Sequence, residues 1–251
     1  IISIQNEDDI IPLFEAYIPT VASFQPERAE QYVLGVDARV DENYSVTIQG
    51  YYKKIKNFIG YNLYRESSSD PDFISGSGES KGIETYVKFK YDNIYGWISY
   101  SLSWSDKILA GYKFAPRYDK RHSISSVFGI KLPYNIDMGV VWDYSSGMPF
   151  TPITGIFYQP SGVVSGNPNE YPEGDARFLF GAKNAARLPS YHKLDVNFKR
   201  SFSFEKLPKV DFGLDFVNVY NHKNIFYFDK KSGKKIYMLP FFITLSLGVE
   251  I

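Results

Sequence analysis

The sequence predicts an all-β fold of the membrane-spanning kind, a segment of an antiparallel β-barrel with about nine to ten strands. Three observations predict it. Apolar and polar residues alternate along segment after segment, the breaks between segments are alternately short and long, and no run approaches the roughly 18 consecutive apolar residues of a transmembrane helix. A period of two puts the two sets of residues on opposite faces of a strand. We therefore expect one face in lipid and one face toward a hydrated lumen.

The first predicted hairpin lies near the start of the chain. Residues 30–40 alternate between apolar and polar positions, and residues 44–54 do so again. The break between them, Asp41-Glu42-Asn43, has the composition of a tight turn. These residues therefore predict two antiparallel strands joined by a short connection.

Two further pairs of strands follow. Residues 83–91 lead through Asp92-Asn93 into 98–104, and residues 124–131 lead through the turn at 133–135 into 136–144. The separation of apolar from polar positions is clearest in residues 98–104. There, three serines alternate with four large residues: Ile98, Tyr100, Leu102 and Trp104. Each pair is predicted to be a hairpin.

Three strands complete the chain. Residues 193–199 and 210–216 alternate on either side of a turn at 205–208, and residues 241–251 form the last strand. The last strand is apolar on one parity to its final residue, through Phe241, Ile243, Leu245, Leu247, Val249 and Ile251. A face this apolar, in a chain with hardly any helix signal, favours contact with hydrocarbon.

The connections divide into two kinds. Turns after the first, third, fifth and seventh strands are short, whereas longer stretches, predicted to be irregular, separate the pairs: 59–80, 107–119, 146–189 and 221–239. Outer-membrane barrels have short periplasmic turns and long extracellular loops, and strands of about 10–13 residues are long enough to cross. The alternative is a soluble antiparallel β-domain, for example a carbohydrate-binding one, with the apolar parity packed in its own core.

Composition excludes several classes of function. The 28 basic and 28 acidic residues balance, so the chain lacks the basic surface that binds nucleic acid. It has no cysteine, and its three histidines are not spaced as a metal site, so no metal, cofactor or disulfide is expected. No pattern of a nucleophile with a base, a phosphate loop or a carboxylate pair is present, so the protein is not expected to be an enzyme.

The chain is expected to be the C-terminal part of a longer protein. It begins at Ile1 without a secretory signal, which an outer-membrane protein needs. Nine strands also cannot close a bacterial single-chain barrel, which has an even number, and an open edge in lipid leaves backbone groups unpaired. We therefore expect further strands N-terminal to this segment.

Several motifs, in this order and spacing, resemble those of TonB-dependent receptor barrels of the type abundant in Bacteroidetes. They are Pro26-Glu-Arg-Ala29 with Gln31-Tyr-Val-Leu-Gly35, Tyr51-Tyr-Lys-Lys54, the segment 96–104 with Arg117-Tyr-Asp-Lys-Arg-His122, Tyr144-Ser-Ser-Gly-Met-Pro-Phe-Thr151, the segment 187–195, and Val217-Asn-Val-Tyr-Asn-His-Lys-Asn224. The resemblance covers residues 26–251. Ile251 departs from it, since such barrels usually end in Phe.

The resemblance implies a 22-stranded barrel in the outer membrane of a Gram-negative bacterium, closed by an N-terminal plug domain that is absent from this chain. Residues 1–26 would be an extracellular loop and the end of a preceding strand, and residues 27–251 the C-terminal strands of the barrel. The implied function is import of a scarce nutrient (siderophore, cobalamin, oligosaccharide or similar) with energy from a TonB-type periplasmic coupling protein. The implied partners are the lipid bilayer, the plug and missing strands, that coupling protein, and a small-molecule or glycan cargo. The alternative is a passive porin-like or adhesive outer-membrane barrel.

The longest connection is the expected place for cargo recognition. Its candidate ligand-binding residues combine flat aromatic surface with a guanidinium, which suits stacking on a sugar or chelate and pairing with an anion: Phe150, Phe157, Tyr158, Tyr171, Arg177 and Phe178. Packing of these residues against neighbouring loops is the alternative. Five aromatic residues near strand ends are expected in the two interfacial belts: Tyr95, Trp97, Trp104, Trp142 and Tyr144. The segment 117–122 is expected to be structural.

Overall fold

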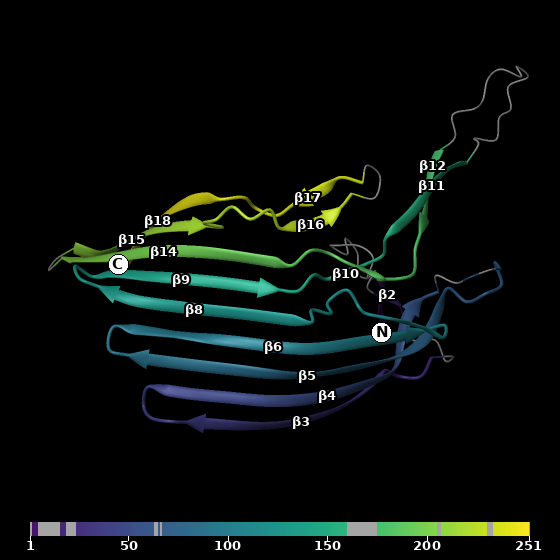
Figure 1. Cartoon of the computed structure of the whole chain (residues 1–251), viewed down its shortest axis with the longest axis horizontal. Coiled ribbons are helices and arrows are strands. Elements are labelled where there is room, and N and C mark those ends of the chain that lie inside the picture. The colour runs from purple at the N-terminus through teal and green to yellow at the C-terminus, as the bar shows by residue number, and fades with distance from the viewer. Residues whose placement is uncertain are drawn as a thin grey trace, which may run out of the picture.

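The computed structural model describes residues 2–4, 16–18, 24–62, 65, 67–159, 175–204, 207–229 and 233–250. Every regular element in these ranges is a β-strand, and most belong to one antiparallel sheet of ten strands (Figure 1). Nine strands follow each other across it: β3 (Arg28–Arg39), β4 (Tyr44–Tyr61), β5 (Phe73–Tyr91), β6 (Ile94–Leu109), β8 (His122–Leu132), β9 (Ile136–Ser145), β14 (Tyr191–Phe204), β15 (Leu207–Val217) and β18 (Phe242–Glu250). The described part contains no helix able to span a membrane.

The nine predicted strands are all present, and each lies beside its predecessor in sequence. The tenth, β7 (Tyr112–Phe114), pairs with the end of β6. Near the N-terminus, β1 (Ile2–Ile4) and β2 (Ala16–Ile18) pair with each other outside this sheet. The domain boundary at residue 26 stays a prediction.

Two predicted loops were partly wrong. β4 and β5 are 18 and 19 residues long, so residues 59–61 and 73–80 are strand, and residues 107–109 and 112–114 form the β6–β7 hairpin. The Gly-Ser composition of 75–78 indicated a loop because glycine is poor in strands. Here small residues are needed for packing, since a Cβ on Gly76 would lie 2.6 Å from the Phe58 ring.

The connections alternate in length as predicted, with the short turns at one end of the sheet and the long connections at the other (Figure 1). The long stretches predicted as irregular contain short hairpins: β10 (Pro149–Phe150) with β13 (Ala186–Arg187), β11 (Ile153–Gln159) with β12 (Asp175–Phe180), and β16 (Ile225–Phe228) with β17 (Lys235–Tyr237). The strands β10, β13 and β17 have only two or three residues, too few for alternation to be detected in a sequence, and β11 and β12 lie in a stretch dominated by Gly, Pro and Asn.

The register aligns the apolar parities of the strands into one continuous face. Ala38, Val46 and Val87 are successive partners on β3, β4 and β5, and the row continues through Ile98. The side chains of this face are exposed: Leu34 is 83% exposed and Leu245 is 69% exposed. Only three hydrophobic residues in the described part are buried, and none belongs to this face. In the described part no core covers the apolar face, as the membrane hypothesis predicts and the soluble one does not.

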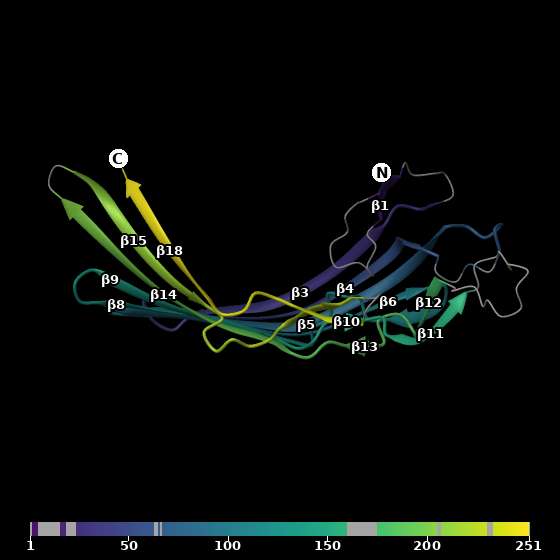
Figure 2. The same ribbon diagram turned by 90° about the horizontal axis from the view of Figure 1, so that it is seen from above.

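The strands are staggered as in a barrel. One row of register partners starts at Tyr44, the first residue of β4, and reaches Phe216, the second-last residue of β15, through Val140 and Val196. Closing a sheet into a barrel requires such tilt and stagger. Figure 2 shows that the sheet is bent, with β15 and β18 rising from the plane of the other strands. The nine strands are thus a wall segment of a larger barrel.

The outward face shows where the membrane ends. In β4 it is apolar or aromatic from Tyr44 to Tyr52, which is about 26 Å along the strand at ~3.3 Å per residue. Lys54 and Lys56 follow on the same parity, and Lys56 forms an ion pair with Glu30 of β3 at 3.5 Å. An apolar band of about 25 Å is typical of outer-membrane barrels. β4, β5 and β6 are long because the last residues of β4 and β6 and the first residues of β5 extend beyond this band.

Two residues assigned to the aromatic belts lie on the other face. Tyr95 and Trp97 share their parity with Ser99, so they point to the polar side, opposite Lys90 and Lys88. Trp104, Trp142 and Tyr144 do lie on the apolar parity, as expected for a belt. The prediction failed for Tyr95 and Trp97 because closeness to a strand end does not determine which face a side chain takes.

Candidate functional site

Three long connections at one end of the sheet are joined, the second to each of the other two, and we call their described residues together the loop layer: 110–121, 146–159 with 175–190, and 218–229 with 233–241. Their base is held by polar side chains that are buried. The most buried carboxylate is that of Asp119, whose residue is 1% exposed. Its Oδ1 accepts a hydrogen bond from the Ser105 backbone N–H at 2.9 Å.

Asp119 also joins the first connection to the second. Its Oδ2 accepts from the Arg187 guanidinium and lies 3.5 Å from Arg121 Nη2. Arg187 Nη1 donates to the Asp119 carbonyl at 2.9 Å and to the Gly147 carbonyl at 3.1 Å. A single buried carboxylate thus contacts two guanidinium groups from different segments. The segment 117–122 is part of a structural clamp, in agreement with the sequence prediction.

A second set of contacts supports the same junction. The side-chain amide of Asn184, which is buried, donates to the Ala115 carbonyl at 2.9 Å. The neighbouring Lys183 places its Nζ 4.7 Å from the centroid of the Phe114 ring, a cation–π distance. The base of the second connection is therefore fastened to the first at several points.

The third connection is organised by asparagines of the motif at 217–224. Asn218 is 1% exposed; its amide donates to the carbonyls of His222 and Leu239 at 3.0 and 3.1 Å, and its Oδ1 accepts from the His222 N–H at 3.0 Å. Its φ of 53° lies in the left-handed region, which Asn tolerates better than most residues. Asn224, also buried, bonds both backbone groups of His192.

Replacing Asn218 by alanine is expected to lower the free energy of unfolding by about 2 kcal/mol. The change removes three side-chain hydrogen bonds, at roughly 1 kcal/mol each, from groups that lie away from water. Urea unfolding of the folded protein measures it. Lys223→Ala, at an exposed neighbour in the same connection, is the control, and an equal loss in both variants would contradict the assigned role.

The histidines lie at the outer edge of the apolar face. His122 Nδ1 is 2.9 Å from the Tyr100 hydroxyl, and His192 Nδ1 is 2.9 Å from the Tyr220 hydroxyl. Burial raises the pKa of the Tyr220 hydroxyl above its ordinary value, so this hydroxyl is protonated at neutral pH. His192 stacks on His222 with centroids 3.6 Å apart. Among the residues described, no three His, Asp or Glu side chains are grouped to hold a metal.

The β11–β12 hairpin projects from the loop layer away from the sheet (Figure 1). It carries four of the six predicted ligand-binding residues. Phe157 lies opposite Arg177, while Phe178 lies opposite Ile156, so Phe178 and Tyr158 share the other face. Tyr158 is 72% exposed.

The other two predicted residues are not part of this hairpin. Phe150 lies in β10 and packs on Phe228 of β16, with ring centroids 5.3 Å apart. Phe150 therefore joins the second and third connections, the packing alternative that the sequence left open. Tyr171 lies outside the described residues.

Sequence analysis missed three exposed hydrophobic residues on the same hairpin. Ile156, Leu179 and Phe180 are each more than half exposed. They adjoin the predicted residues in two unbroken apolar runs, Ile156-Phe157-Tyr158 and Phe178-Leu179-Phe180, and these runs were the available signal. They were hidden because Gly, Pro and Asn dominate the surrounding stretch.

The family model described as TonB-dependent receptor-like β-barrel matches residues 10–221. The chain belongs to the TonB-dependent receptor family. Membership confirms the resemblance inferred from the motifs, and it places this barrel segment in the outer membrane of a Gram-negative bacterium. This is a family of receptors and not of enzymes, as the sequence predicts. A search of curated protein sequences found no match.

Solved TonB-dependent receptors share the fold at low sequence identity. The ferric-catecholate import receptor Fiu of Escherichia coli K12 is 15% identical over 92% of this chain, with a TM-score of 0.59. The ferripyoverdine receptor of Pseudomonas aeruginosa is 10% identical over 92%, with a TM-score of 0.64. The outer-membrane transporter YddB of Escherichia coli is 11% identical over 92%, with a TM-score of 0.62. The match covers 29%, 29% and 33% of those chains.

Family membership identifies the environment of each face of the sheet. The apolar parity is the lipid-facing wall of the TonB-dependent receptor, and the polar parity is its lumenal wall. On the lumenal wall, charged and polar groups pair across strands, as between Gln49 and Glu84 at 2.8 Å and between Lys199 and Asp211 at 3.0 Å. The loop layer stands at the extracellular mouth.

Proposed function

We propose that this chain is the C-terminal barrel segment of a receptor that binds a scarce nutrient outside the cell and imports it with energy delivered through a TonB-type coupling protein. The observation that carries the proposal is family membership over residues 10–221, together with a lipid-facing wall and an extracellular loop layer. The full receptor would include an N-terminal plug and the remaining strands. Residues 27–251 form its C-terminal wall in this proposal.

The geometry supports a role of the loop layer in capturing cargo. Its base is held by buried polar contacts around Asp119 and Asn218, whereas the β11–β12 hairpin exposes aromatic side chains above it. A loop layer fixed at its base and carrying a hairpin with exposed aromatic side chains suits cargo recognition. Aromatic side chains supply contact area with little loss of conformational entropy. The cargo is proposed to be a small molecule or glycan with a flat or apolar surface.

The decisive experiment for active import is uptake with and without the coupling protein. Cells that carry the receptor should accumulate labelled cargo, and deletion of the coupling protein should abolish accumulation. Uptake that continues at the same rate in the deletion strain would identify a passive porin. An upstream chain without a plug would also identify a passive porin.

Replacing Phe157 and Tyr158 together by alanine is expected to weaken cargo binding about 10- to 30-fold. Each aromatic contact contributes on the order of 1 kcal/mol, and both side chains are exposed in the free hairpin. Equilibrium binding to the purified receptor measures the change. Tyr237→Ala, on the exposed β17 of the third connection, is the control, since it removes an exposed aromatic from another hairpin. Unchanged binding in the double variant would exclude this hairpin as the cargo contact.

A further inference from the structure

Two histidines that are far apart in the sequence stack on each other where the third connection meets the barrel wall. His192 is the second residue of β14, and His222 lies in the motif at 217–224. Their ring centroids are 3.6 Å apart, and the ring planes are inclined by 27°. The two imidazoles are therefore in direct contact, and both residues are partly buried.

The hydrogen bonds of His192 favour its neutral form. The Tyr220 hydroxyl accepts a hydrogen bond from the indole N–H of Trp142, a group that can only donate. The hydrogen of the Tyr220 hydroxyl then points to His192 Nδ1, which lies 2.9 Å away. Nδ1 is thus the acceptor, and the ring proton of His192 lies on Nε2. A second proton, on Nδ1, would remove this acceptor from the Tyr220 hydroxyl.

The surroundings of the stacked pair offer no counter-charge. On β9, the register partner of His192 is Tyr144. The first carboxylate along β14, that of Asp195, lies on the lumenal parity and is already in an ion pair. On the third connection, the residue after His222 is Lys223, which is a further cation. Among the ion pairs of the described residues, none includes either histidine. A charge on the pair would therefore be uncompensated.

Buried asparagines hold the backbone of both histidines. Asn218 bonds the N–H and the carbonyl of His222, each at 3.0 Å. Asn224 bonds the N–H and the carbonyl of His192, at 3.0 and 2.8 Å. Asn218 also donates to the Leu239 carbonyl at 3.1 Å, near the returning end of the connection. Repulsion between the two rings would therefore act on the contacts that hold the third connection to the wall.

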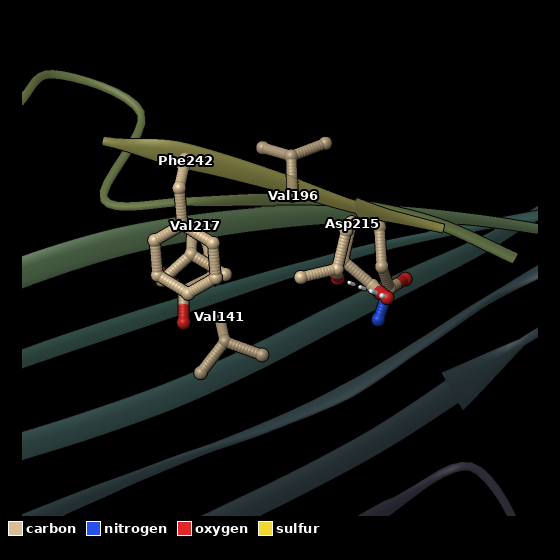
Figure 3. A pocket seen from close by; sticks show the side chains of 8 residues that line it. Val141, Val196, Asp215, Val217 and Phe242 are labelled. Carbon is tan, nitrogen blue, oxygen red and sulfur yellow. Dashed lines mark hydrogen bonds between the residues drawn. The ribbon is translucent and has the colours of Figure 1, made fainter. Parts of the chain in front are cut away.

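The outer part of the third connection can open without disturbing the barrel. The connection leaves the sheet after Val217 and returns at Phe242, which are register partners and lie side by side in Figure 3. Its ends are thus fixed by the wall. Its outer part, the β16–β17 hairpin, contacts the second connection through the packing of Phe228 on Phe150. Opening at the histidine pair would therefore free this hairpin from the rest of the loop layer.

We propose that the stacked pair His192–His222 is a pH-sensitive switch, which keeps the third connection closed on the wall at neutral pH and opens it in a mildly acidic medium. In the open connection each imidazole takes up a proton independently, near pH 6.5. In the closed connection a charge on one ring repels a charge on the other, and a proton on His192 Nδ1 removes its bond with Tyr220.

The direction of the pH dependence follows from these proton counts. Below about pH 6.5 the open form binds more protons than the closed form, so the stability of the closed form rises with pH. The contribution of the pair is fully present above about pH 6.5, and it is lost as the pH falls from there toward about 5. Because the switch requires neither cargo nor a coupling protein, its failure would leave the proposed function unaffected.

The test is amide hydrogen exchange of the full-length receptor in lipid at pH 7.5 and at pH 5.0, with each rate corrected for the intrinsic pH dependence of exchange. Protection of the amides at 218–229 and 233–241 should fall about tenfold at the lower pH, the factor that corresponds to one proton displaced by one pH unit. Protection of β4, β5 and β6 should change by less than about twofold. Equal protection of the third connection at both pH values would overturn the switch, and so would an equal fall in β4, β5 and β6.

Two variants and a matched control assign the response to the pair. His222→Phe keeps a flat ring on His192 but cannot take up a proton, so the change in protection between the two pH values should be below about twofold. His222→Gln, which is also uncharged, should give the same result. The control is His122→Phe, because His122 has the same 2.9 Å contact with a tyrosine hydroxyl, that of Tyr100, which also supplies its described ring contact. It should retain the tenfold response. A response that survives in the His222 variants, or that is also lost in the control, would overturn the proposal.

Discussion

Replacing Asp119 by alanine is expected to lower the free energy of unfolding of the receptor by about 3 kcal/mol. The carboxylate is buried, and its removal leaves the guanidinium groups of Arg121 and Arg187 without a counter-charge and the Ser105 N–H without an acceptor. Breaking a buried ion pair from one side typically costs about 3–5 kcal/mol. The lower end applies because both arginine side chains are about one-third exposed.

Urea unfolding of the purified full-length receptor measures this loss, and limited proteolysis locates it. Cleavage should accelerate in the connections 110–121 and 146–190, which Asp119 joins. Asp106→Ala is the matched control. It removes an aspartate paired with Lys113 at 2.9 Å across the exposed β6–β7 hairpin, and such surface pairs contribute less than about 1 kcal/mol. Equal losses from the two variants would show that burial of Asp119 has no energetic role.

Replacing Val140 by arginine is expected to make folding into a bilayer less favourable by about 2–4 kcal/mol. Val140 is the central outward residue of β9, between Phe128 and Val196 on the neighbouring strands. An arginine on the lipid face at the middle of the bilayer costs this amount, and the penalty falls toward the interfaces. Equilibrium folding of the full-length receptor into lipid vesicles measures it.

Ile108→Arg is the matched control for depth. Ile108 has the same outward parity, but it follows Asp106 in β6 and lies beyond the apolar band. The penalty there should be below about 1 kcal/mol. A penalty at Val140 no larger than that at Ile108 would mean that this face does not contact hydrocarbon.

How far the candidate site could be predicted depends on the range of the interactions. Phe157 and Tyr158 are exposed, as the composition of the long connection suggested, and their role in binding cargo stays a prediction. Phe150 has the same composition and the same loop, yet it packs on Phe228, which lies 78 positions later in the sequence. No local pattern predicts such a partner, so the sequence did not separate a residue that joins two connections from one that is exposed.

The apolar residues of the lumenal wall and the clamp at Asp119 show the same limit. Trp97, Val141 and Phe242 fall on the polar parity of their own strands, where each is an isolated exception. They become a row only when the stagger of β6, β9 and β18 brings them to one level. Asp119 and Arg187 are likewise far apart in sequence and meet through the packing of two connections.

By itself the sequence determined the nine strands, their order, the face each presents to lipid, and the end of the sheet that carries the long connections. These follow from alternation and turn chemistry, which act over a few residues. The tertiary structure alone decided how far β4, β5 and β6 extend beyond the membrane, which side chains fasten the loop layer, and which apolar residues meet on the lumenal wall. Those features depend on register between strands and on contacts between distant connections, and a pattern with a period of two carries no information about either.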